Sequence, residues 1–169
     1  NRTRIVREII EGIREACGPD FVIGCRLNGR EFHPTKQGIT AEQAAENARA
    51  FVEAGAQYIS IAGYGYGPTP FRYCPDYFPY PEPDPFMEPF MDEYRGVGLW
   101  TAVARRIKDA VDVPVITAGR MDENLAERVL EAGDADVIAL GRTLWADPWF
   151  ARKVDEGRID EIMRCTRCA

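Results

Sequence analysis

The hydrophobic positions of the chain follow two different spacings, which predict where helices and strands lie. Over residues 3–16 the apolar side chains recur at steps of three and four, with arginine and glutamate between them, which is typical of an amphipathic helix. Short continuous apolar runs indicate buried strands instead. Four such runs occur, at residues 21–27, 57–62, 113–118 and 135–140.

Helix start signals fall between these predicted strands. Thr40 and Gln43 have the spacing of a capping box, in which each side chain accepts a hydrogen bond from the other residue's backbone N–H. Asp122 and Asp147 each precede another helical pattern, where a carboxylate can cap the first turn. A further helix is expected over about residues 97–110. The chain is thus predicted to be a helix followed by four pairs of strand and helix.

This order of elements predicts an α/β fold with parallel strands. Strands that are apolar throughout are typical of parallel sheets whose two faces are both covered. A complete eight-unit barrel needs about 250 residues, whereas 169 residues contain four predicted strands. Because the chain begins with a helix rather than a strand, we expect residues 1–164 to form the C-terminal half of a TIM barrel. The alternative is a small open sheet of flavodoxin type, which would normally begin with a strand.

Composition and charge exclude several classes of protein. Hydrophobic residues make up 46% of the sequence, which is an ordinary share for a globular domain and excludes extensive disorder. With 21 basic and 27 acidic residues the net charge is −6, which argues against a nucleic-acid partner. No apolar run reaches about 18 residues and no basic leader precedes one. Neither a membrane span nor a signal peptide is therefore predicted, and a cytoplasmic protein is expected.

One segment interrupts the regular spacing of strands and helices. Residues 63–95 separate a predicted strand from the next helix, and they contain eight of the 12 prolines and ten of the 18 aromatic residues. A connection of about two to six residues is typical at this place. In a barrel such a loop leaves the carboxyl end of a strand, where active sites are assembled. Two interpretations stay open: aromatic side chains that line a substrate pocket, and a loop that covers an interface.

Two Gly-Arg dipeptides each follow a predicted strand directly. Gly119-Arg120 and Gly141-Arg142 stand 22 residues apart, which is one unit of strand and helix, so neighbouring strand ends present both. Glycine lets an anion approach the main chain, and a guanidinium adds a charged, forked donor. Because barrels often hold phosphate at their last two strands, we interpret these residues as a phosphate site. The alternative is that each arginine pairs with a surface carboxylate such as Asp122 or Asp147.

Strand alternation separates Arg26 from the apolar side of the first predicted strand. The even positions from Val22 to Asn28 share one face, and the apolar odd positions share the other. We expect Arg26 to point into the barrel near its upper end, where a buried cation requires an anionic or electron-rich partner. A phosphate-bearing ring system would supply one, and a salt bridge inside the barrel is the alternative.

Cys165 and Cys168 form a single C-x2-C motif close to the end of the sequence. Zinc sites and iron–sulfur sites usually need four ligands, so two cysteines leave zinc, a cluster and coincidence open. The position of the motif predicts that residues 165–169 begin a metal-ligand segment.

Taken together, these motifs resemble the C-terminal half of the FMN barrel of the old yellow enzyme family, in its 2,4-dienoyl-CoA reductase and NADH:flavin oxidoreductase branch. The similarity covers nearly the whole chain. It is carried by IGCRLNG (23–29), VPVITAGRM (113–121), GDADVIALGRTLWADPWFARK (133–153) and GRIDEIMRCTRC (157–168). The resemblance implies an FMN-dependent NAD(P)H oxidoreductase, in which reduced FMN transfers hydride to an activated C=C bond of an enoyl-, dienoyl- or aryl-CoA substrate.

The resemblance also implies roles for the residues already singled out. Arg26 corresponds to the arginine that faces the flavin N1 and C2 carbonyl. The FMN phosphate site corresponds to both Gly-Arg dipeptides with the residue before each, namely Ala118, Gly119, Arg120, Leu140, Gly141 and Arg142. Cys165 and Cys168 correspond to the first two ligands of a four-iron, four-sulfur cluster whose other ligands would lie beyond Ala169.

The sequence departs from the family pattern at the expected proton donor. Dienoyl-CoA reductases have a histidine after the second strand of this half, whereas residues 63–67 here are Gly-Tyr-Gly-Tyr-Gly. We expect Tyr66 or Tyr64 to replace it, since a phenol near hydride transfer can protonate a developing enolate. The long aromatic loop is similar to those of reductases that act on polycyclic aryl-CoA thioesters.

The resemblance further implies partners that this sequence does not contain. These are an N-terminal half barrel, a C-terminal electron-transfer domain and an acyl- or aryl-CoA substrate, and a homo-oligomer is compatible with them. Two other functions stay open at this point. One is a non-redox, phosphate-binding half barrel related to isomerases or lyases, and the other is a structural fragment without turnover.

Overall fold

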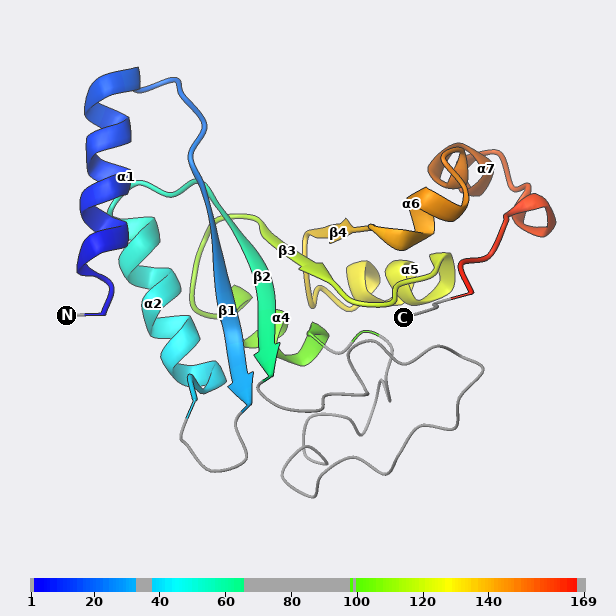
Figure 1. The fold of residues 1–169 in the computed structure, drawn as a ribbon, viewed down its shortest axis with the longest axis horizontal. Helices are drawn as coiled ribbons and strands as arrows, with labels where there is room; N and C mark the ends of the chain where they lie inside the picture. Colours follow the sequence, from blue (N-terminus) through cyan, green and yellow to red (C-terminus); the bar gives the residue numbers. More distant parts are fainter. Residues whose placement is uncertain (1, 33–37, 66–97, 99, 167–169) are drawn as a thin grey trace.

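The computed structural model describes residues 2–32, 38–65, 98 and 100–166. Through these residues helices and strands alternate in the predicted order up to residue 139, and only helices follow (Figure 1). The helices are α1 (Arg4–Cys17), α2 (Ala41–Glu53), α4 (Thr101–Lys108), α5 (Glu123–Glu131), α6 (Arg142–Ala146), α7 (Phe150–Asp155) and the short 3₁₀ helix η2 (Ile159–Glu161). The strands are β1 (Gly24–Phe32), β2 (Tyr58–Gly65), β3 (Val115–Ala118) and β4 (Val137–Ala139).

The described strands form one parallel sheet of four strands in the order β1-β2-β3-β4. The register aligns Arg26 of β1 with Ser60 of β2, and Ser60 with Ile116 of β3. Ile116 is in turn aligned with Val137 of β4. Because all strands run in the same direction, their carboxyl ends meet at one edge of the sheet. The predicted α/β fold with four parallel strands is therefore confirmed.

Helices cover one face of this sheet. The buried strand residues on that face are Leu27, Ile59, Ile61, Val115 and Thr117, and they pack with the apolar sides of α1, α2, α4 and α5. On the other face Arg26, Val137 and Ala139 are exposed. The uncovered face is the one that points to the interior in a barrel, as a half barrel requires.

The predicted capping signals make the hydrogen bonds expected of them. In α2 the Gln43 N–H donates to Thr40 Oγ1 at 3.3 Å, and the Thr40 N–H donates to Gln43 Oε1 at 3.2 Å. In α5 the Leu125 N–H donates to Asp122 Oδ1 at 2.8 Å. Each cap satisfies donors that a helix start leaves unpaired, which is worth about 1 kcal/mol. The Asp122 cap therefore fixes where α5 begins after β3.

Gly29 lies inside β1, although an Asn-Gly dipeptide such as Asn28-Gly29 is typical of loops. The register with β2 shifts between Asn28 and Arg30, so Gly29 sits at an irregularity of the strand. A Cβ atom at position 29 would lie 2.5 Å from Cγ1 of Val103 and 2.8 Å from Cγ2 of Ile61. Glycine at this position lets α4 pack directly on the strand.

The longer strand changes the position of Arg26. The sequence predicts a strand at residues 21–27, whereas β1 spans Gly24–Phe32. Six residues of β1 therefore follow Arg26, whereas the predicted strand would leave only one. Similarly β2 continues to Gly65, and the rest of the aromatic loop predicted at 63–95 lies outside the described residues.

The segment after β4 differs from the single last helix that the sequence predicts. α6 begins at Arg142 and is too short, at five residues, to show a hydrophobic period. Asp147, expected to open the last helix, is 3% exposed and lies between α6 and α7. Its carboxylate accepts hydrogen bonds from Lys153 Nζ at 2.6 Å, the Met163 N–H at 2.9 Å and the Trp149 N–H at 3.0 Å. Asp147 thus joins α6, α7 and the residues after η2.

α1, the longest helix of the described residues, has both buried and exposed apolar side chains. In α1, which has 14 residues, Ile10 is buried against the core while Ile5 and Ile9 are exposed. Across the described ranges, no helix combines the length and the apolar composition that crossing a bilayer requires.

Gly63 of β2 makes room for the ring of Trp100. A Cβ atom at position 63 would lie 1.8 Å from Cη2 of Trp100, whose residue is only 8% exposed, so the ring would have to shift within the core. We expect Gly63→Ala to lower the free energy of unfolding by about 1–3 kcal/mol, measured by urea denaturation, because overpacking forces side chains from their rotamers. Gly12→Ala in α1 is the control, since no atom lies within 4 Å of its Cβ, and it should stabilise by about 0.5–1 kcal/mol. Equal stability of Gly63→Ala and the parent protein would contradict this packing.

Asp147 makes the stability of the fold sensitive to acid. The hydrogen bond from Lys153, followed by that from the Met163 backbone, lowers the pKa of Asp147 below its ordinary value of 3.8. Since the pKa is lower in the folded state, the carboxylate stabilises the fold above about pH 4, and this contribution is lost as the pH falls through the folded pKa. We expect Asp147→Asn to lower the midpoint of thermal unfolding at neutral pH. As the pH is lowered, the midpoint of this variant should fall less than that of the parent protein.

The control for this prediction is Asp155→Asn, because Asp155 is exposed at the end of α7. It should change neither the midpoint nor its dependence on pH. A midpoint for Asp147→Asn that equals that of Asp155→Asn at neutral pH would show that Asp147 does not join these helices.

Candidate functional site

The loop after β3 has an unusual backbone conformation. Gly119 has a φ of 122°, and Arg120, with a φ of 53°, is the non-glycine residue with positive φ in the described part of the chain. Strained conformations of this kind cost about 1–3 kcal/mol and are concentrated at functional sites. The Gly98 N–H donates a hydrogen bond to the Gly119 carbonyl at 2.7 Å, which helps to hold the loop.

The loop after β4 lies against the loop after β3. Ala118 at the end of β3 is aligned with Ala139 at the end of β4, so both loops leave the sheet at the same level. The loop after β4 ends at Arg142, the first residue of α6. The Thr143 hydroxyl then donates a hydrogen bond to the Met121 carbonyl at 3.3 Å. This bond joins the two loops directly.

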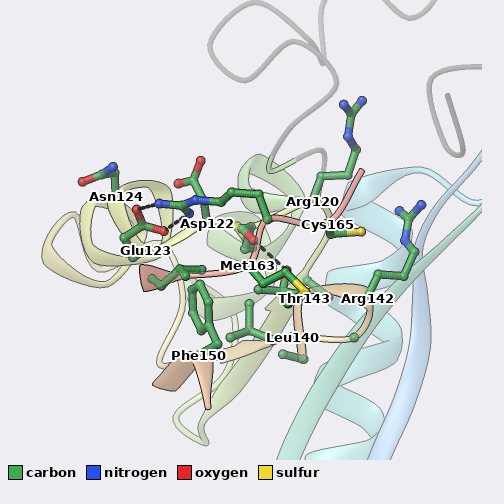
Figure 2. Close-up of a pocket in the computed structure, with 17 residues that line it drawn as sticks. Arg120, Asp122, Glu123, Asn124, Leu140, Arg142, Thr143, Phe150, Met163 and Cys165 are labelled. Carbon is green, nitrogen blue, oxygen red and sulfur yellow. Dashed lines mark hydrogen bonds and ion pairs between the residues drawn. The ribbon is translucent and has the colours of Figure 1, made fainter. Parts of the chain in front are cut away.

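The two loops line one pocket with a volume of about 530 Å³. The first turn of α5 and residues 162–165 complete its walls. Figure 2 shows the side chains of Arg120 and Arg142 extending from the two loops in the same direction. The predicted phosphate-site residues that line the pocket are Ala118, Gly119, Arg120, Leu140, Gly141 and Arg142. The structure thus brings this whole predicted set together.

The carboxylates closest in sequence to the two arginines serve the fold. Asp122 accepts a hydrogen bond from the Leu125 N–H as the cap of α5. Asp147 forms an ion pair with Lys153 at 2.6 Å. Asp122 and Asp147 thus each have a partner within the fold.

An acidic side chain in the pocket wall is paired with an arginine. Glu123, in the first turn of α5, accepts hydrogen bonds from Arg164 at 2.5 Å (Nη1 to Oε2) and 2.6 Å (Nη2 to Oε1), drawn as dashed lines in Figure 2. The hydrogen bond from Arg164 lowers the pKa of Glu123, and the same bond raises the pKa of Arg164. Both groups are therefore charged at neutral pH, and their charges cancel at the pocket wall.

Residues 162–165 are held against the pocket by backbone as well as side-chain contacts. Ile162 is 8% exposed, and the Met163 N–H donates to Asp147 Oδ2 at 2.9 Å. Just before this segment, Lys153 Nζ donates to the Glu161 carbonyl at 2.8 Å. Position and direction of the segment are thus fixed by α6, α7 and α5 together.

The donors of this pocket fit a phosphate group. Arg120 and Arg142 supply two guanidinium groups, each a forked donor that matches the oxygens of a phosphate. No atom lies within 4 Å of a Cβ built at Gly141, so the space beside this loop is open to a ligand. Because Glu123 is neutralised by Arg164, the pocket favours an anion.

Arg26 lies elsewhere on the same face of the sheet. It is exposed in the middle of β1, aligned with Ser60 and through it with Ile116. Since Ile116 and Ala118 are two residues apart in β3, they share a face with Arg26. The residues that line the pocket do not include Arg26. The structure therefore brings Arg120 and Arg142 into one pocket. It places Arg26 outside this pocket, on the face of the sheet that the helices leave uncovered, which is called the open face below.

The predicted metal ligands and proton donors are only partly described. Cys165 is half-buried and lines the pocket, whereas Cys168 and Tyr66 lie outside the described residues. Tyr64 is in β2, aligned with Glu31 of β1. Within the described ranges, no group of three or more His, Cys, Asp or Glu residues is placed to hold a metal ion. The roles of these cysteines and tyrosines stay predictions.

The sequence did not indicate Thr143, Glu123 or Arg164 as parts of the site. Thr143 directly follows the second Gly-Arg dipeptide, which is a weak signal that could have found it. Glu123 and Arg164 are 41 residues apart, and no local spacing relates positions so far apart. Their pairing follows only from the packing of residues 162–165, called the C-terminal segment below, on α5.

Comparison with known proteins supports the resemblance seen in the sequence. Residues 96–161 match the model of the NADH:flavin oxidoreductase / NADH oxidase family. The chain is 34% identical over 168 residues to an NADH oxidase of Thermoanaerobacter brockii, a match that covers 99% of this chain and 23% of that protein. A cinnamate reductase of Clostridium sporogenes is 32% identical over 174 residues, with 99% of this chain and 25% of that protein covered.

The fold is also similar to solved structures of this kind. A 2-naphthoyl-CoA reductase solved with 2-naphthoyl-CoA has a TM-score of 0.76 and 28% identity, with 99% of this chain and 23% of that chain covered. This chain thus spans about a quarter of the length of these three relatives. Sequence motifs, the four-stranded parallel sheet and the paired Gly-Arg loops agree in making this chain similar to the NADH:flavin oxidoreductase / NADH oxidase family.

Proposed function

We propose that this chain is part of an FMN-dependent NAD(P)H oxidoreductase and that its pocket holds the phosphate of FMN. The observation that carries the proposal is the meeting of Arg120 and Arg142 in one pocket, from loops that leave neighbouring parallel strands. Two forked cations in one pocket match the geometry and the charge of a phosphate. The family match supports a flavin nucleotide as the molecule that carries this phosphate.

Each residue of the pocket has a defined part in this proposal. Arg120 and Arg142 bind the phosphate oxygens, and Gly119 and Gly141 let the ligand approach the main chain. The bond from Thr143 to the Met121 carbonyl keeps the two loops, and hence the two guanidinium groups, at a constant separation. Binding therefore needs little reorganisation of the protein, which favours affinity.

We assign the ring end of the flavin to the part of the open face near Arg26. Three steps between neighbouring strands separate β1 from β4, a distance of about 14 Å at about 4.8 Å a step. A nucleotide that has its phosphate between the β3 and β4 loops can extend across this distance toward β1. The Arg26 guanidinium would favour electron uptake by the ring, because it attracts the negative charge that reduction adds.

The reaction that we propose is hydride transfer to an activated C=C bond. Bound FMN supplies this chemistry, with NAD(P)H as the source of the hydride. The protein positions the reacting groups and provides the proton, for which Tyr66, with Tyr64 as the second candidate, is our proposal. An acyl- or aryl-CoA thioester is the proposed substrate class, supported by the similarity to a 2-naphthoyl-CoA reductase.

We also propose that Cys165 and Cys168 are the first two ligands of a four-iron, four-sulfur cluster. Thiolates are the usual ligands of such clusters, and a cluster supplies single-electron transfer. Cys165 lines the same pocket as the two arginines, which is compatible with a cluster that serves the flavin. Because the chain spans about a quarter of its relatives, the remaining ligands, the rest of the barrel and an electron-transfer domain are proposed to come from other parts of the protein.

The test of the phosphate site compares FMN with riboflavin, which lacks the phosphate. In the intact protein freed of flavin, we expect Arg120→Ala and Arg142→Ala each to weaken FMN binding by about tenfold or more and to leave riboflavin binding nearly unchanged. The reason is the loss of charge-assisted hydrogen bonds, worth about 1.5–3 kcal/mol each. Quenching of flavin fluorescence on titration measures both affinities.

Two further variants make this test selective. Arg128→Ala removes an exposed arginine of α5 and should change neither affinity. Arg26→Ala should weaken the binding of FMN and of riboflavin by the same factor, because both molecules contain the flavin ring. If Arg120→Ala and Arg142→Ala leave the ratio of FMN to riboflavin affinity unchanged, the pocket does not bind the flavin phosphate. A colourless protein that binds other phosphate esters would instead support the non-redox alternative.

The cluster proposal predicts the iron content of a cysteine variant. We expect Cys165→Ser to lower iron and acid-labile sulfide in the purified intact protein to less than about half, since a hydroxyl replaces a thiolate ligand. Cys17→Ser, at the exposed end of α1, is the matched control and should keep the full content. Unchanged iron in Cys165→Ser would remove this residue from the ligand set.

A further inference from the structure

We propose that Glu123 and Arg164 are positioning residues for the phosphate end of the nucleotide, and that Arg164 makes the pocket selective for a phosphorylated flavin by cancelling the charge of Glu123. This inference rests on the proposed function and adds to it a pair of residues that no sequence motif marks. It is carried by the ion pair between α5 and the C-terminal segment in the wall of the pocket (Figure 2).

The two partners of this ion pair differ in exposure. The side chain of Glu123 is 7% exposed, whereas that of Arg164 is 52% exposed. Water therefore reaches the arginine but hardly reaches the carboxylate. A carboxylate in such a place depends on its partner, because removing one member of a buried pair leaves an uncompensated charge.

The carboxylate and the proposed phosphate share one pocket. Glu123 lines the pocket together with Arg120 and Arg142, and it lies three residues after Arg120 in the chain. Two negative groups in one partly buried pocket repel each other more strongly than in water. With Arg164 in place the pair has no net charge, so a ligand meets the charges of the two loop arginines and of Asp122, the carboxylate that caps α5.

Arg164 also holds the wall of the pocket. It lies between Met163, whose N–H is bound by Asp147, and Cys165, which lines the pocket. The two hydrogen bonds to Glu123 have the forked geometry that restricts both groups. The pair thus ties the segment before the C-x2-C motif to the first turn of α5.

A purely structural bridge and a charge-cancelling pair predict different results. Loss of a structural bridge would disturb the pocket wall and weaken the binding of both flavins by the same factor. Loss of charge cancellation would instead weaken the binding of FMN, which carries the phosphate, and leave the binding of riboflavin nearly unchanged. The second effect would also be relieved by removing the carboxylate charge or by screening it with salt.

The experiment titrates FMN and riboflavin into the intact protein freed of flavin, for the variants R164A, E123Q and R164A/E123Q. For R164A we expect FMN binding to weaken by about tenfold and riboflavin binding by less than about threefold, since the charge repulsion acts on the phosphate. Adding E123Q should restore FMN binding to within about threefold of the parent, because the repelling charge is gone. The R164A defect should also shrink at about 0.5 M salt, where the screening length is only a few ångströms.

Each other outcome has a defined meaning. If the parent protein binds FMN no better than riboflavin, the proposed phosphate site fails, and this inference fails with it. If the parent prefers FMN but R164A loses both flavins equally, loses neither, or is not rescued by E123Q, the proposed function stands and this inference is overturned. If R164A does not fold, E123Q alone decides. Its amide has the shape of the carboxylate, so a gain in the preference for FMN supports the inference, and an unchanged or smaller preference overturns it.

Discussion

The parallel pairing of β3 with β4 is the constraint on which the proposed site depends. It aligns Ala118 with Ala139, so the loops that follow leave the sheet at the same level and on the same edge. The hydrogen bond from Thr143 to the Met121 carbonyl then joins these loops. Without this alignment Arg120 and Arg142 would belong to separate surfaces, and neither alone would distinguish a phosphate from any other anion.

The acidic residues around the pocket are each engaged in a contact that serves the fold. Asp122 caps α5, Asp147 joins α6 and α7 with the C-terminal segment, and Glu123 pairs with Arg164. The ion pairs of Glu123 and Asp147 cancel two negative charges in a chain whose net charge is −6. In the pocket this leaves the two loop arginines with Asp122, a balance of one positive charge. Stability and ligand preference are coupled at this end of the sheet.

The sequence predicted the features that depend on local chemistry. The order of helices and strands, the capping box of Thr40 and Gln43 and the Asp122 cap follow from neighbouring residues, and all are present. The two Gly-Arg loops were found because each follows an apolar strand directly. The bounds of β1 were not predicted correctly. An Asn-Gly dipeptide is typical of a loop, but in the fold Gly29 lies inside the strand and allows α4 to pack closely on it. Nor could the pair of Glu123 and Arg164 be found, because only tertiary packing brings residues 41 positions apart together.

The most direct test of the central claim is a crystal structure of the intact protein with FMN bound. The account predicts phosphate oxygens within hydrogen-bond distance, about 3 Å, of the guanidinium groups of both Arg120 and Arg142, with the ring lying over the open face toward β1. A flavin whose phosphate contacts neither arginine, or one that lies on the face covered by the helices, would contradict it.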